Sequence, residues 1–135
     1  MSLTFATMLL VQFAPPLDGA AAQRVEGRCT YPPALVEQAE EAMLVQCGEA
    51  VFTADGIAFA ARGFTPAIAF RGEWEGDGLR VAEVARRGIE PIDEARGFCR
   101  LQMRQGQLSA VVCSIVGGPR SYLVNFLVPQ LNNPL

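Results

Sequence analysis

The sequence predicts a mainly β protein with one short N-terminal helix. From Leu44 onward the chain consists of short runs rich in Val, Ile, Phe and Tyr, separated roughly every eight to twelve residues by Gly-containing turns. Within these runs apolar and polar residues alternate, as in strands with one buried face. Four cysteines in a chain of 135 residues further indicate a small domain held by disulfides.

The first 22 residues have the features of a cleavable secretory signal. An apolar run from Leu3 to Ala14 is followed by two prolines and an A-x-A site that ends at Ala22, although no Lys or Arg precedes the run. We expect cleavage after Ala22, which leaves residues 23–135 as a single domain. A retained anchor is one alternative, but the run is shorter than the about 20 residues that a bilayer core needs. A buried N-terminal segment of a cytoplasmic protein is the other.

The next element is expected to be a helix over residues 32–43, since Pro32 and Pro33 suit a first turn. Its apolar face would carry Leu35, Ala39, Ala42 and Met43, and its solvent face Glu37, Glu40 and Glu41. Seven strands should follow, near residues 44–53, 57–62, 67–75, 79–87, 96–104, 108–116 and 121–128.

Alternation within the strands predicts which side chains face the core. One set of apolar residues alternates with charged or polar neighbours on each strand: Ile68, Phe70 and Trp74; Cys99, Leu101 and Met103; Tyr122, Val124, Phe126 and Val128. Closure removes exposed sheet edges, so we expect a small antiparallel β-barrel or strongly curled sheet. A barrel related to the OB-fold and a β-sandwich remain alternatives.

Cys29, Cys47, Cys99 and Cys113 predict two disulfides and an oxidising compartment, periplasmic or secreted. A three-residue loop around Gln105-Gly106 would place Cys99 opposite Cys113 on the apolar face, whereas a two-residue loop would place Cys99 opposite Val112. We therefore expect the three-residue loop and a Cys99–Cys113 bridge, which leaves Cys29 to pair with Cys47. No C-x-x-C is present, which argues against a redox motif or a zinc ribbon.

The composition excludes several chemistries. The chain has no His and no Lys, which removes Ser-His and Cys-His pairs, Schiff-base lysines, histidine metal sites and P-loops. We expect no enzymatic activity, no catalytic residue, no cofactor and no metal. The densest carboxylate cluster, which a carboxylate-dependent enzyme would have to use, is Glu73, Glu75, Asp77 and Glu83. The stretch that begins at Glu73 partly resembles a calcium-binding loop. Its twelfth position, however, is Val84, where such a loop requires a bidentate Glu.

The charge pattern indicates the kind of partner. Loss of Asp18 with the signal leaves 13 acidic and 11 basic side chains, so nucleic acid is not expected. All basic residues are Arg, which reflects either GC-rich codon usage or anion recognition. A possible face for an anionic ligand or partner consists of Arg62, Arg71, Arg100 and Arg104; a solvated face with interleaved Glu is the alternative.

The leading hypothesis is an exported, non-catalytic binding or interaction module of the cell envelope. Its partner would be an envelope or extracellular protein or an anionic ligand, and no membrane span would remain after removal of the signal. The alternatives are an inhibitor of a secreted hydrolase and, less favoured by the residues present, a carboxylate-dependent enzyme.

Overall fold

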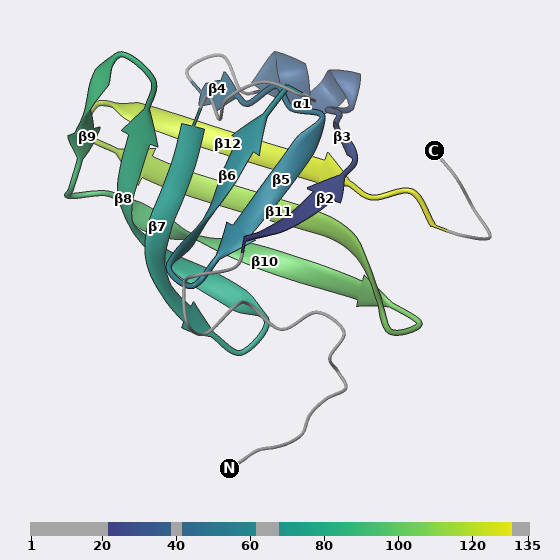
Figure 1. The fold of residues 1–135 in the computed structure, drawn as a ribbon. Helices are drawn as coiled ribbons and strands as arrows, with labels where there is room; N and C mark the ends of the chain where they lie inside the picture. The colour runs from purple at the N-terminus through teal and green to yellow at the C-terminus, as the bar shows by residue number, and fades with distance from the viewer. Residues whose placement is uncertain (1–21, 39–41, 62–67, 131–135) are drawn as a thin grey trace, which may run out of the picture.

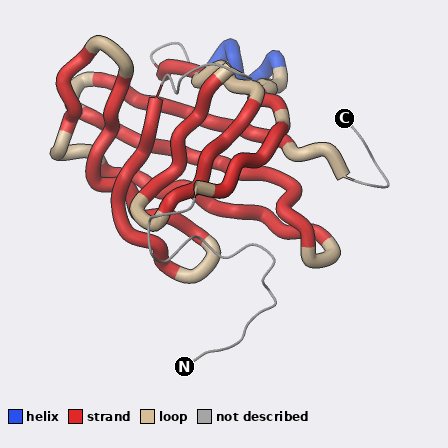
Figure 2. The backbone as a smooth tube through the Cα atoms, in the orientation of Figure 1, coloured by secondary structure: helices blue, strands red, loops and turns tan. Residues whose placement is uncertain are grey.

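The computed structural model describes residues 22–38, 42–61 and 68–130, and within them it confirms the predicted fold class. Antiparallel strands dominate, with one short helix at the upper edge of the sheet (Figure 2). The elements are β2 (Gln23–Glu26), β3 (Arg28–Cys29), α1 (Pro33–Gln38), β4 (Ala42–Leu44), β5 (Glu49–Thr53), β6 (Gly56–Ala60), β7 (Ile68–Glu75), β8 (Gly78–Arg86), β9 (Ile89–Ile92), β10 (Arg96–Arg104), β11 (Gln107–Gly117) and β12 (Arg120–Leu127).

The described strands all belong to one eleven-stranded sheet, in the order β2-β5-β6-β7-β8-β10-β11-β12-β3 (Figure 1). The hairpin strand β9 pairs with β8, and β4 pairs with β12 outside this path. From β5 to β8 and from β10 to β12 each strand lies beside the next strand in sequence, and the sheet curls upon itself without closing. A strongly curled sheet is thus found in place of the two packed sheets of a sandwich.

The two ends of the sheet meet where β2 passes into β3. β2 pairs with β5, whereas β3, one residue further on, pairs with β12 at the opposite end of the strand order. Gly27 lies between them, and a Cβ there would stand 2.4 Å from the Leu127 carbonyl oxygen. The amide of Cys29 donates to the Cys47 carbonyl at 3.0 Å. The chain segment 27–29 therefore joins both edges, and we call it the seam.

The predicted helix is too long. α1 ends at Gln38, residues 39–41 lie outside the described part, and Ala42–Leu44 form a strand that pairs in parallel with β12. The Val45 amide extends this pairing to the Leu123 carbonyl at 3.0 Å. In the sequence, Ala42 and Met43 fit the apolar pattern of a helix as well as that of a strand. The backbone hydrogen bonds that the edge of β12 offers favour the strand.

The interior of the curled sheet is filled by aromatic side chains, as alternation predicted for β7 and β12. Phe59 packs edge-on against Phe70 and Phe126, with ring centroids 6.0 and 5.9 Å apart, and Phe70 packs against Tyr122 at 6.2 Å. All four of these rings are fully buried. Because the interior is occupied by the protein's own side chains, binding surfaces must be sought on the outside.

The β10–β11 hairpin confirms the predicted cysteine pairing but corrects the predicted loop. Cys99 lies opposite Cys113 and Leu101 opposite Val111, as expected. The loop, however, has two residues, because Arg104 pairs directly with Gln107. A β-bulge at Ser109, between the pairs Gln102–Ala110 and Met103–Leu108, supplies the extra residue that keeps both cysteines on the inner face.

Candidate binding surface

Both predicted disulfides are present, Cys29–Cys47 and Cys99–Cys113, so none of the four cysteines is free. Cys99 and Cys113 are buried within the β10–β11 hairpin. Cys29–Cys47 connects the seam to the segment that leads into β5. Two disulfides in a small domain indicate an oxidising, extracytoplasmic environment.

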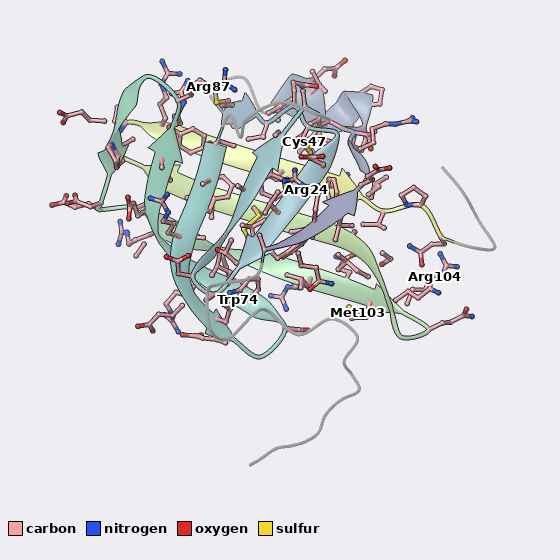
Figure 3. All side chains as sticks on the ribbon, viewed as in Figure 1. Arg24, Cys47, Trp74, Arg87, Met103 and Arg104 are labelled. Atoms are coloured by element: carbon pink, nitrogen blue, oxygen red, sulfur yellow. A yellow bond between two sulfur atoms is a disulfide. The ribbon has the colours of Figure 1, made fainter. Side chains whose placement is uncertain are left out.

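The four arginines singled out in the sequence are not gathered at one place. Arg62 lies outside the described residues. Arg71, Arg100 and Arg104 are exposed, but Arg71 lies opposite Glu83 whereas Arg100 lies opposite Gly78, about 16 Å further along β8. Arg104 lies with Met103 at the tip of the β10–β11 hairpin (Figure 3). Of the four, Arg100 stands in the surface described below.

Two members of the predicted carboxylate cluster, Glu75 and Glu83, form ion pairs on the outside of β7 and β8. Arg80 makes a bidentate contact to Glu75, with N–O distances of 2.5 and 2.9 Å, and Arg71 contacts Glu83 at 3.3 Å. The Arg80 hydrogen bond lowers the pKa of the Glu75 carboxyl below its ordinary value. In the described ranges, no three Asp, Glu or Cys side chains are arranged to hold a metal ion.

One buried carboxylate lies beside the seam. Glu49, on β5, is almost fully buried and forms an ion pair with Arg24 on the neighbouring strand β2. Trp74 is held in a similar structural role, because its indole N–H donates to the Thr53 carbonyl at 3.0 Å and its ring packs near Phe52. Both residues thus connect β5 to an adjacent part of the fold.

A different surface emerges on the outer face of β10 and β11. Outward-facing residues of these strands pair directly: Arg96 with Val116, Phe98 with Ser114, and Arg100 with Val112. Val112, in the middle of β11, is 37% exposed, and Val116, near the end of the same strand, is 50% exposed. We call this surface the β10–β11 wall and define it by these six residues.

An aromatic side chain anchors the β10–β11 wall to the neighbouring strand. Phe98 lies over Gly78 of β8, where a Cβ would come within 2.2 Å of its ring. The Arg100 guanidinium in turn sits 5.7 Å from the centroid of the Phe98 ring. This cation–π contact holds the arginine in place and leaves its N–H donors available.

The β10–β11 wall is cationic because its segment of the chain contains no acid. Residues 95–135 include Arg96, Arg100, Arg104 and Arg120 but no Asp or Glu, and all 14 acidic residues precede residue 95. Arg96 and Arg100 form no ion pair with any carboxylate in the described part of the chain. Charge counted in sequence windows, combined with strand alternation, could have revealed this surface from the sequence.

A concave site lies elsewhere, at the end of the sheet where β4, β7 and β8 meet. Its cavity measures about 440 Å³ and is lined, among described residues, by Met43, Leu44, Val45, Gln46, Ile68, Arg86 and Arg87. Figure 3 places Arg87 at this upper edge, beside β4. Arg86 packs its guanidinium 5.9 Å from the centroid of the buried Tyr122 ring. We call this site the β4–β8 pocket.

Comparisons with protein families, with curated proteins and with solved structures found no match to this chain. Among the described residues no helix reaches the length and apolarity of a membrane span.

Proposed function

We propose that this protein is an exported, non-catalytic binding module that docks an acidic protein surface on the β10–β11 wall. The observation that carries the proposal is the combination of Arg96 and Arg100, which have no carboxylate partner among the described residues, with the exposed Val112 and Val116. On β7 and β8, by contrast, Arg71 and Arg80 are neutralised by neighbouring glutamates. The wall thus carries uncompensated positive charge on a chain with a formal net charge of −3.

The composition of the wall favours a protein as the partner. Protein interfaces are enriched in Arg and aromatic residues and place apolar side chains at the centre of the contact. Phe98, Val112 and Val116 supply the apolar part, and the arginines supply bidentate donors that match carboxylates in geometry. Opposite charge on the partner would accelerate association, and the apolar contact would discriminate against acidic patches that lack apolar side chains.

Residues outside the wall support a binding role over a catalytic one. The sequence lacks His and Lys, and all four cysteines are in disulfides. Glu75, Glu83 and the buried Glu49 are each held by an arginine. A general acid or base must be able to exchange its proton with a substrate, and carboxylates held as ion pairs are poorly suited to this role.

Export is part of the proposal, with residues 1–22 as a removable signal and the periplasm or the extracellular space as the destination. The two disulfides support an oxidising compartment. Intact mass of the protein from its native source tests both points. The expected mass is that of residues 23–135, with a gain of about four hydrogens on reduction. A full-length mass, or no gain on reduction, would contradict this part.

A matched pair of substitutions tests the wall. Val112→Glu places a carboxylate opposite Arg100, where a cross-strand ion pair would neutralise this arginine without disturbing the core. Val36→Glu makes the same change at an exposed valine on α1, which is 47% exposed. Both variants should fold, so any difference in binding reports on the wall itself.

The three proteins, wild type and both variants, would be immobilised and exposed to the extracytoplasmic fraction of the native source. We expect a saturable protein partner that wild type and Val36→Glu retain, that Val112→Glu loses, and that salt releases. Retention of the same proteins by all three, or of none, would refute the proposal. If the partner is a hydrolase, its activity with and without the bound module shows whether binding inhibits it.

A further inference from the structure

The β4–β8 pocket has features that the proposed function does not use. It shares no residue with the β10–β11 wall, and it is concave where the wall is an open sheet face. It exists because β4 pairs with β12 and not with β7, so the start of β7 and the end of β8 face β4 across an opening. A volume of about 440 Å³ falls within the usual range for small-molecule sites.

The lining of the pocket combines two chemistries. Met43, Leu44, Val45 and Ile68 provide apolar surface, and Val45 and Ile68 are themselves buried. Arg86 and Arg87 provide guanidinium groups at the end of β8, and no carboxylate is among the described lining residues. Such a lining matches a molecule with an apolar body and an anionic head.

Arg86 is the better placed of the two arginines to hold that head. It is half-buried, and its contact with the fully buried Tyr122 ring holds it close to β4, since Tyr122 pairs with Met43. No described carboxylate lies within ion-pair distance of Arg86. An arginine that is already ordered loses little side-chain entropy when it binds an anion.

We propose that the β4–β8 pocket binds a small amphipathic anion, a carboxylate with an apolar chain or ring. The carboxylate accepts hydrogen bonds from the Arg86 guanidinium, and the apolar body lies against Met43, Leu44 and Ile68. This site is independent of the β10–β11 wall, and either can fail without the other.

Decanoate and 1-decanol separate the anionic contribution from the apolar one, because they share a chain and differ in charge. Calorimetric titration of the whole protein should show saturable decanoate binding and at least about tenfold weaker binding of decanol, the loss expected for one charge-assisted hydrogen bond. Equal binding of the two, or no saturable decanoate binding, would overturn the proposal.

Arg86→Met tests the assigned residue, since methionine retains an apolar stem against Tyr122 and removes the charge. Arg100→Met is the matched control, because Arg100 also stacks on an aromatic ring but lies in the wall. We expect Arg86→Met to weaken decanoate binding about tenfold and to leave decanol unchanged, with Arg100→Met showing neither effect. If Arg100→Met weakened decanoate binding and Arg86→Met did not, the anion would bind at the wall and the proposed pocket site would be refuted.

A second variant covers the case in which Arg86→Met does not fold. Leu44→Glu brings a carboxylate into the pocket from the half-buried strand β4, and Val36→Glu adds the same charge on α1. Decanoate binding should disappear in Leu44→Glu and persist in Val36→Glu. Undiminished binding in a folded Leu44→Glu protein would show that the anion sits elsewhere.

Discussion

At the residue scale, the two tyrosines occupy opposite situations. The Tyr31 hydroxyl lies 2.5 Å from the Val45 carbonyl oxygen and 3.1 Å from that of Leu123, and so ties the segment after β4 to β12. Tyr122 is fully buried, and its hydroxyl has no hydrogen-bond partner in the described part of the chain. One hydroxyl therefore stabilises the fold, and the other costs free energy.

Tyr31 gives the protein a predictable response to alkali. Burial raises the pKa of the Tyr31 phenol, outweighing the opposite effect of backbone groups of Asn125 and Val45. Because the folded pKa lies above the unfolded one, this contribution is complete below about pH 10 and is lost as the pH rises through the folded value. The chain has no Lys, and both disulfides are formed, so neither lysine nor cysteine side chains titrate in this range.

Tyr31→Phe should therefore lower stability by about 1–2 kcal/mol near neutral pH, for the loss of the hydroxyl's hydrogen bonding. As the pH rises above about pH 10, its stability should fall less steeply than that of wild type. Urea unfolding across this range is the measurement. Parallel curves for the two proteins would show that Tyr31 is not the titrating group.

Tyr122→Phe should act in the other direction. Removing a buried hydroxyl that has no partner relieves its desolvation cost, so the free energy of unfolding should rise by about 1 kcal/mol. Thermal unfolding beside Tyr31→Phe checks the sign. A clear loss of stability would reveal a partner for this hydroxyl.

At the scale of elements, alternation predicted the long strands well and the chain's irregularities poorly. Ile68 and Phe70 on β7, and Tyr122, Val124 and Phe126 on β12, are buried as expected. Met103 was expected beside Cys99 and Leu101 in the core, but it lies opposite Leu108 close to the hairpin turn, and it is 44% exposed. A bulge and a longer loop give the cysteines the same register, so sequence alone could not distinguish them.

A substitution in the turn of the β10–β11 hairpin should raise the stability of the protein. Gln105 has a φ of 54° and Gly106 one of 79°, so both central residues of the two-residue turn occupy the left-handed region. Asn tolerates this region better than Gln, and Gln105→Asn should stabilise the protein by about 0.5 kcal/mol. Gln107→Asn, at the first position of β11, is the control and should not stabilise. Equal shifts in melting temperature would contradict the assigned turn.

At the scale of the whole molecule, the seam decides the architecture. The two-residue strand β3 pairs with Phe126 and Leu127, far away in the sequence, and such a pairing leaves no local pattern to predict. The β2 and β3 strands were missed for this reason. The wall, by contrast, lies in the predicted register of β10 with β11, and it was missed because charge was not counted along segments of the chain.

Gly27→Ala tests the seam. The new methyl group would lie 2.4 Å from the Leu127 carbonyl oxygen and 2.6 Å from the Phe126 ring, and should destabilise the protein by about 2 kcal/mol or more. Gly88→Ala, where a Cβ meets nothing within 4 Å but φ is 78°, should cost only about 1 kcal/mol. A harmless Gly27→Ala would mean that β3 does not approach β12 so closely.

We propose that this protein, although its formal net charge is negative, binds acidic polypeptide because Arg96 and Arg100 of the β10–β11 wall form no ion pair in the described part of the chain. The most direct test is to follow the backbone amide NMR signals during titration with poly-L-glutamate. We predict salt-sensitive shifts concentrated at Arg96, Phe98, Arg100, Val112 and Val116, and their loss in Val112→Glu. Absent shifts, or shifts centred on β7 or on the β4–β8 pocket, would contradict it.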